Sequence, residues 1–194
     1  MIVSSQTMST SLPMPDSLTV GISNVMFSQS IKTLGMTLDT HLSMKIRVVN
    51  LAKTADFELR RITSIRYYLS LEATQPLVSA FVTSRLDYCH SHLYGCPQNL
   101  INILQKVQNN AVHLQTLHLL PVDARIQYKI CSLCFSAINS SGPQYFADLL
   151  KIYTPSRQLC SSADTCTLSI PSIHTQTYGQ RAFHTLHTLS RISL

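Results

Sequence analysis

Apolar residues recur every three or four positions between residues 44 and 62, with polar residues between them. Because an α-helix turns once every ~3.6 residues, this spacing gathers the apolar side chains on one helical face. The sequence therefore predicts an amphipathic helix here. Its buried face would consist of Met44, Val48, Leu51, Ala55, Leu59 and Ile62.

The same period predicts further helices along the chain. Ser70 is a good N-cap residue for a second helix, which would end before the Gly-Cys-Pro sequence at residues 95–97. A third helix is expected to start near Gln98. Two more follow, one over residues 122–138 and a short one over residues 144–150. Together these stretches predict a helical bundle.

Alternating, β-prone residues occupy the region before the first helix. Residues 18–22 and 25–27 form two short runs separated by Ser23 and Asn24, which predicts a hairpin. Residues 31–38 form a third run, which we expect to complete a small antiparallel sheet. A sheet this small is only marginally stable alone, so it should pack on another part of a protein.

The predicted fold class is mainly α (α+β), with a small N-terminal antiparallel β-hairpin region, a thumb-like helical bundle and a poorly ordered C-terminal tail. The two ends are rich in Ser and Thr and lack periodicity. The expected organisation is an irregular start over residues 1–16, the hairpin region over 17–40, helices over 41–114, further helices over 115–152 and an irregular tail over 153–194.

The charge is sparse and unevenly distributed. Only 12% of residues are charged, against about 25% in a typical soluble domain. The net charge is +6, and residues 45–66 alone carry six cations and two anions, which leaves +4. A cluster of cations on a helix can neutralise nucleic-acid phosphates, and Tyr67 and Tyr68 could pack against sugars or bases. A solvated helix face is the alternative interpretation.

The six cysteines do not predict a disulfide framework, because no apolar leader precedes them that would send the chain to an oxidising compartment. The sequence contains no run of about 18 apolar residues, so no transmembrane helix is expected. We therefore expect an intracellular protein, cytoplasmic or nuclear, that is not secreted and has no membrane partner. Cys131 and Cys134 fall within a predicted helix, where core thiols are expected rather than a metal site.

Motifs for catalysis are missing from the sequence. It contains no H-E-x-x-H, no G-x-S-x-G and no phosphate-binding glycine loop. Its nine carboxylates are thinly spread, with no D-D or D-x-D pair, whereas a two-metal polymerase site needs clustered carboxylates to hold two cations about 4 Å apart. The prediction is no catalytic residue, no metal ligand and no cofactor in this chain.

Several strings resemble, in order, the C-terminal part of Jockey-like LINE (non-LTR) retrotransposon reverse transcriptases. The similarity extends over residues 17–183, and an ordered set of strings is more specific than any single one. The strings are I-K-T-L-G-M-T-L-D at 31–39, S-R-L-D-Y-C at 84–89, L-Y-G at 93–95, L-Q-K-V-Q-N-N-A at 104–111, L-H-L-L-P-V at 117–122, G-P-Q-Y at 142–145 and Y-G-Q-R-A-F at 178–183.

This resemblance implies a region that follows the catalytic palm of an RNA-directed DNA polymerase. It would contain the last palm hairpin, a primer-grip segment and the thumb, and its partners would be a primer–template duplex of RNA or DNA and the missing palm. The parent enzyme would use Mg²⁺. The residues implied to bind nucleic acid are Leu34, Gly35, Lys45, Lys53, Arg60, Arg61 and Arg66.

The sequence departs from the family pattern at three places, one of which is the family's closing W-N-S-L-P-like end, absent here. The family has a Trp where this chain has Leu119, and the basic connection between Ala111 and Leu117 is almost gone. The last two changes indicate a transposon-derived remnant with at most residual nucleic-acid binding. The alternative is a co-opted protein–protein interaction module that uses the face where the palm once packed. The sequence leaves the oligomeric state open.

Overall fold

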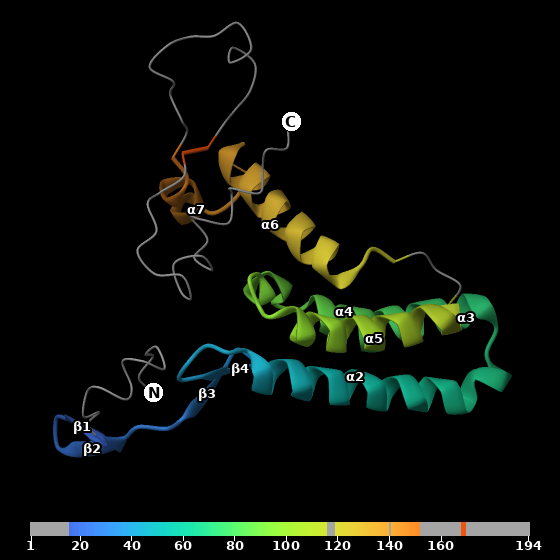
Figure 1. Ribbon diagram of the computed structural model, residues 1–194, viewed down its shortest axis with the longest axis horizontal. Coiled ribbons are helices and arrows are strands. Elements are labelled where there is room, and N and C mark those ends of the chain that lie inside the picture. Colours follow the sequence, from blue (N-terminus) through green and yellow to red (C-terminus); the bar gives the residue numbers. More distant parts are fainter. Residues whose placement is uncertain (1–15, 116–118, 140, 152–167, 170–194) are drawn as a thin grey trace, which may run out of the picture. The chain divides into compact units, whose positions relative to one another are not determined.

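The computed structural model describes residues 16–115, 119–139, 141–151 and 168–169. The chain is mainly α-helical, with two small β-hairpins before the first helix (Figure 1). It divides into two compact units. Unit 1 takes in residues 1–89 and 96–122, and unit 2 takes in residues 90–95 and 123–194.

The first hairpin pairs β1 (Ser17–Val20) with β2 (Ser23–Met26) in antiparallel register, Ser17 opposite Met26. A hairpin was predicted here, but with its turn at Ser23 and Asn24. The chain instead reverses at Gly21 and Ile22, because Gly21 adopts a φ of +63° that glycine reaches without steric cost.

The second hairpin was not predicted. Residues 31–38 were expected to form one strand, but they divide into β3 (Ser30–Thr33) and β4 (Met36–Asp39), which pair antiparallel. Leu34 and Gly35 between them have φ values of +50° and +77°. Two consecutive positive φ values are the signature of the tight type I′ turn, and a leucine at its first position is uncommon. The described strands thus form two separate hairpins rather than one sheet.

Helix α2 (Lys45–Ile65) confirms the first predicted helix. Of its predicted apolar face only Leu51 is half-buried, and the other residues are buried. The carboxylate of Asp39 accepts hydrogen bonds from the backbone N–H groups of Ser43 (3.1 Å) and Met44 (3.3 Å). The last residue of β4 therefore holds the loop that leads into α2.

The second predicted helix is interrupted. After the 3₁₀ turn η1 (Arg66–Tyr68), Ser70 caps α3 (Leu71–Val78) by accepting a hydrogen bond from the N–H of Ala73. A π-helical segment, η2 (Ser79–Thr83), then leads into α4 (Ser84–Asp87). Pro76 lies inside α3, and a proline there removes a backbone donor and crowds the preceding turn. Regular hydrogen bonding consequently does not continue through the segment.

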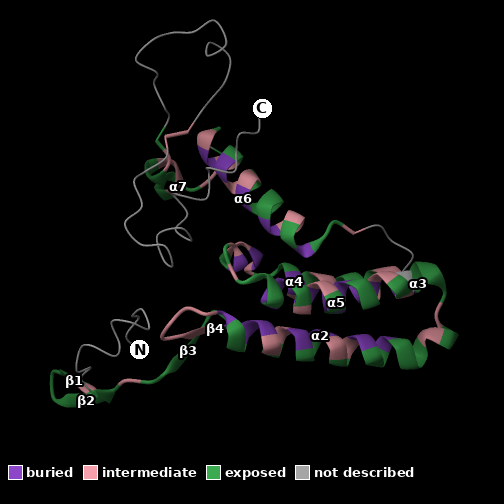
Figure 2. Ribbon diagram, in the orientation of Figure 1, coloured by how far each residue is buried: buried purple, intermediate pink, exposed green. Residues whose placement is uncertain are grey.

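Helix α5 (Gln98–Gln115) packs along α2, and the two form the centre of unit 1 (Figure 1). Figure 2 shows the buried positions of α2 as a stripe on the side toward α5. Their packing removes Val48, Ala55 and Leu104 completely from solvent. Burying such side chains is the main stabilising contribution, about 1.5–3 kcal/mol for a large aliphatic one.

Two glutamines of α5 fix the segment that follows it. The Nε2 of Gln108 donates to the carbonyl of Leu120 at 2.6 Å, and the Oε1 of Gln105 accepts from the N–H of Val122 at 2.8 Å. Two of the strings that carry the family resemblance, around residues 104–111 and 117–122, therefore meet through these bonds. These hydrogen bonds give Gln105 and Gln108 a structural role, and no binding function is needed to explain the two glutamines.

Unit 2 contains η3 (His90–Leu93), most of α6 (Val122–Ile138) and α7 (Gln144–Leu149). Both helices were predicted. Cys134 is buried and Cys131 half-buried, as expected for thiols on an amphipathic helix. The irregular start and tail predicted for residues 1–16 and 153–194 lie almost entirely outside the described residues.

Candidate nucleic-acid interface

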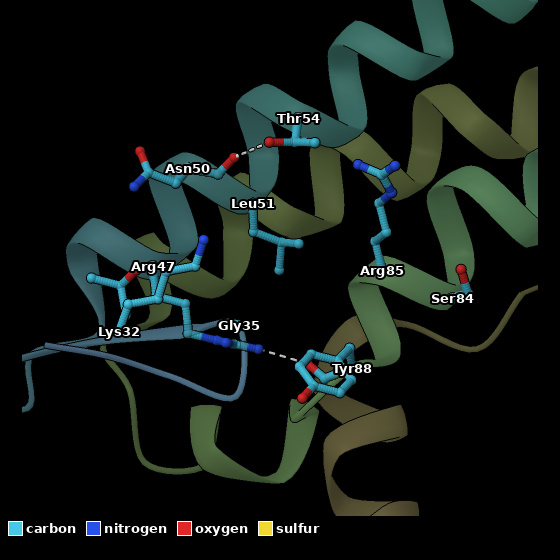
Figure 3. Close-up of a pocket in the computed structure, with 10 residues that line it drawn as sticks. Lys32, Gly35, Arg47, Asn50, Leu51, Thr54, Ser84, Arg85 and Tyr88 are labelled. Atoms are coloured by element: carbon cyan, nitrogen blue, oxygen red, sulfur yellow. Dashed lines mark hydrogen bonds between the residues drawn. The ribbon is translucent and has the colours of Figure 1, made fainter.

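An open pocket of about 530 Å³ lies in unit 1, between the β3–β4 hairpin, one flank of α2 and the short helix α4 (Figure 3). The hairpin, α2 and the α4 region each contribute side chains or backbone to the wall. We call it the basic pocket. Its lining residues are Lys32, Gly35, Thr37, Arg47, Asn50, Leu51, Thr54, Ser84, Arg85 and Tyr88.

The charge of the basic pocket has one sign. Lys32, Arg47 and Arg85 line it, and no Asp or Glu does, so its lining carries a formal charge of +3. The remaining polar lining includes the hydroxyl of Thr37 and the amide of Asn50, whereas the hydroxyls of Thr54, Ser84 and Tyr88 already donate to backbone carbonyls. This combination suits an anionic ligand, because cations supply attraction and neutral donors supply hydrogen bonds.

Arg47 is the most enclosed of the three cations, with only 7% of its surface exposed. Its Nη2 donates to the backbone carbonyl of Tyr88 at 2.6 Å (Figure 3). Its buried Nε has no hydrogen-bond partner among the described residues, and no carboxylate there forms a salt bridge with it. A buried cation that lacks an acidic partner is costly, and an anion in the adjoining pocket would offset that cost.

Arg85 is held by an acidic residue just outside the lining. Its Nη2 lies 3.4 Å from Glu58 Oε1, and the other oxygen of Glu58 lies 3.3 Å from Arg61 Nη1. One carboxylate thus lies between two guanidinium groups. Because the Arg85 side chain remains 40% exposed, it can still present N–H groups to a ligand in the pocket.

Tyr88 connects the β3–β4 hairpin to Arg47. Its hydroxyl donates to the carbonyl of Leu34 at 2.6 Å, while its own carbonyl accepts the bond from Arg47. Hydrogen bonding to the Cys89 side chain and the negative charge of its thiolate form raise the pKa of Tyr88, and Arg47 opposes the rise. The phenol therefore stays protonated, and able to donate, throughout the neutral range.

The predicted binding residues divide into several environments. Gly35 lines the basic pocket, and Leu34 stands at its rim with 85% of its surface exposed. Three cations of α2 are exposed, do not line the pocket and pair with no carboxylate among the described residues, and we call them the outer-flank cations: Lys45, Lys53 and Arg60.

The other two predicted cations are engaged by the protein itself. Arg61 pairs with Glu58 and lies 5.8 Å from the centre of the Phe57 ring. Arg66 is half-buried and donates to the carbonyl of Leu69 at 2.8 Å. Arg66 is thereby committed to its own helical region, whereas Arg61 shares Glu58 with Arg85 and keeps 67% of its side chain exposed.

The three pocket cations were not singled out from the sequence. Lys32 and Arg85 do lie within strings that carry the family resemblance, and Arg47 lies within the basic segment of residues 45–66. These positions were the only indication in the sequence that the three cations could matter for binding. What the sequence did not indicate is that residues 32, 47 and 85 line the same pocket.

Within the described residues, no three His, Cys, Asp or Glu side chains gather into a set that could hold a metal ion. Of the helices in that part of the chain, none has the length and apolar character that crossing a bilayer requires.

Comparison with known proteins gave no match: no protein family, no curated protein and no solved structure is significantly similar to this chain.

Proposed function

We propose that this chain derives from the RNA-directed DNA polymerase (reverse transcriptase) of a LINE-type retrotransposon and that it binds a primer–template duplex without performing nucleotidyl transfer. The ordered strings over residues 17–183 support the origin. The observation that carries the binding function is the basic pocket, with three lining cations and no lining acid. The proposal places the chain inside the cell, in the cytoplasm or nucleus, where cysteines stay reduced.

No catalytic step belongs to this proposal. The Mg²⁺ ions that the parent enzyme would use need clustered carboxylates, and the described residues do not supply such a cluster. In the parent enzyme a separate palm domain would provide them and would be a partner of this region. The chain's own contribution is to hold the duplex by its backbone.

A nucleic-acid backbone fits the pocket in charge and in size. Phosphates carry the negative charge that Lys32, Arg47 and Arg85 can neutralise, and protein hydroxyls and amides commonly bond to phosphate and sugar oxygens. The volume of about 530 Å³ lies within the range of about 300–1,000 Å³ that accommodates ligands the size of a nucleotide. We expect backbone contacts, which position a duplex without reading its sequence.

A salt titration of duplex binding tests the proposal. The affinity of the chain for a labelled RNA–DNA primer–template would be measured by fluorescence anisotropy at several salt concentrations. If three cations each neutralise one phosphate, log K should fall with log salt with a slope of about −2.7, since each phosphate contributes about −0.9. Lys32→Ala should make that slope less steep by about one unit.

The matched control is Lys106→Ala, because Lys106 is an exposed lysine of α5 that does not line the pocket. It should leave the slope unchanged. Absence of binding at low salt would overturn the proposed function. An equal change of slope in the two variants would instead mean that the chain binds nucleic acid, but not through the basic pocket.

A second candidate function is a protein–protein interaction module, and one observation favours it. The β1–β2 hairpin exposes a row of apolar side chains, with Ile22 and Met26 among the most exposed residues. A two-stranded hairpin is marginally stable alone, so a partner that covers it would stabilise it. The same salt titration separates the two functions, because an interaction module without a nucleic-acid role predicts no binding of the duplex even at low salt.

A further inference from the structure

We infer that the Tyr88 hydroxyl is a positioning group that holds the β3–β4 turn at the rim of the basic pocket and thereby sets how tightly the pocket binds a nucleic-acid backbone. This inference rests on the proposed function. Tyr88 also lines the pocket, and the role assigned here to its hydroxyl is to arrange the turn.

The first step is the bond between the hydroxyl and the turn. Tyr88 Oη donates to the carbonyl of Leu34 at 2.6 Å, across 54 residues of sequence. The turn it holds contains Gly35, a lining residue, and follows the strand that carries Lys32. Since β4 is the strand of this hairpin that packs on α2, the hydroxyl adds a second attachment at the hairpin's tip.

The second step is the bond between the same residue and Arg47. The carbonyl of Tyr88 accepts from Arg47 Nη2 at 2.6 Å, and this guanidinium has a buried Nε with no partner among the described residues. One residue at the end of α4 is therefore bonded both to the turn and to the enclosed cation. Opening the hydroxyl bond would release the turn, which carries the pocket wall at Gly35, while leaving the Arg47 bond in place.

The third step is that the hydroxyl contributes little to the core. Tyr88 is 50% exposed, and the Leu34 carbonyl that it bonds belongs to a residue that is 85% exposed. Water can replace the hydroxyl at that carbonyl once the turn moves away. Removing the oxygen atom should consequently free the turn without unfolding unit 1.

The substitution Tyr88→Phe tests this role because it removes the hydroxyl alone. Duplex affinity should weaken by about three- to tenfold, the range expected from losing one hydrogen bond that the bound arrangement needs. The salt slope should stay the same because the number of phosphate contacts does not change. Amide hydrogen exchange at residues 33–36 should become faster, while the thermal midpoint stays close to that of the wild type.

Tyr128→Phe is the matched control, since Tyr128 is a 69% exposed tyrosine of α6, in unit 2. It should alter neither affinity nor exchange at residues 33–36. A Tyr88→Phe variant that binds like the wild type overturns the inference while leaving the proposed function standing, and so does unchanged exchange at the turn. If the wild type itself binds no duplex at low salt, the proposed function fails and this role fails with it.

Discussion

The basic pocket and the outer flank of α2 each present three cations, in very different surroundings. On the pocket flank, Arg47 is enclosed and bonded to Tyr88, next to neutral polar side chains. On the other flank, Lys53 and Arg60 are exposed to solvent. Exposed charges are screened by water and salt, whereas an enclosed charge acts through a medium of lower dielectric constant. The comparison teaches that the position of a cation, rather than the number along the sequence, decides what it can bind.

Charge reversal on each flank should give the largest difference. Lys32→Glu places a carboxylate at the basic pocket and should lower duplex affinity by about tenfold or more, equivalent to ~1.4 kcal/mol. Lys53→Glu reverses another exposed lysine, on the outer flank, and should change duplex affinity by less than about threefold, because this residue does not line the basic pocket. Binding isotherms at one salt concentration would measure both, and equal losses would remove the distinction between the flanks.

Removing the Asp39 carboxylate should affect both flanks together, because it holds the loop that begins α2. Asp39→Ala leaves the N–H groups of Ser43 and Met44 without that acceptor and should lower the free energy of unfolding by about 1 kcal/mol, the usual net contribution of a hydrogen bond. Urea denaturation would measure the loss. Asp16→Ala is the control, and a similar effect there would show that the hydrogen bonds of Asp39 to the loop contribute nothing.

The pH dependence of the Asp39 contribution has a defined sign. Burial raises the pKa of Asp39, but the hydrogen bonds from the Ser43 side chain and from the backbone of Ser43 and Met44 outweigh it and leave the pKa below its ordinary value. The stabilisation is therefore fully present above the ordinary aspartate pKa of about 3.9. It is lost as the pH falls through the lowered folded-state pKa. Wild type and Asp39→Ala should become equally stable in that acidic range.

Two thiols of α6 also differ in their surroundings, and this difference should produce a smaller effect, on their reactivity. Burial, with a contribution from Cys131, raises the pKa of Cys134 to about 11, so at pH 8 only about a thousandth of it is thiolate, the reactive form. Cys131 is half-buried and should be alkylated first by iodoacetamide, as fragment mass spectrometry would show. In urea the two should react alike. Equal labelling of the folded protein would contradict the burial of Cys134.

The helices could be predicted from the sequence wherever apolar spacing was regular. In α2 the recurrence of Val48, Ala55 and Leu59 is sufficient, because tertiary packing uses the same face that the period defines. The interruption at η2 was not predicted, although Pro76 marked a weak point. The turn at Leu34 was not predicted, because leucine rarely adopts a positive φ and its presence does not indicate a reversal of the chain.

The basic pocket could not be predicted for a different reason. Lys32, Arg47 and Arg85 lie in three separate elements, and no sequence period brings them together. The basic segment of residues 45–66 was visible as a run of cations, but Arg61 and Arg66 within it are bonded to the protein itself. Arg47 lines the pocket because the hairpin and α4 pack against α2, and this packing cannot be read from the sequence.

The most direct test compares the salt dependence of duplex binding for two double variants. Replacing Lys32 and Arg85 with alanine removes two pocket cations, and replacing Lys53 and Arg60 removes two outer-flank cations. The pocket pair should make the slope of log K against log salt less steep by about two units, and the outer-flank pair should leave it near the wild-type value. A change confined to the outer-flank pair would contradict binding through the basic pocket.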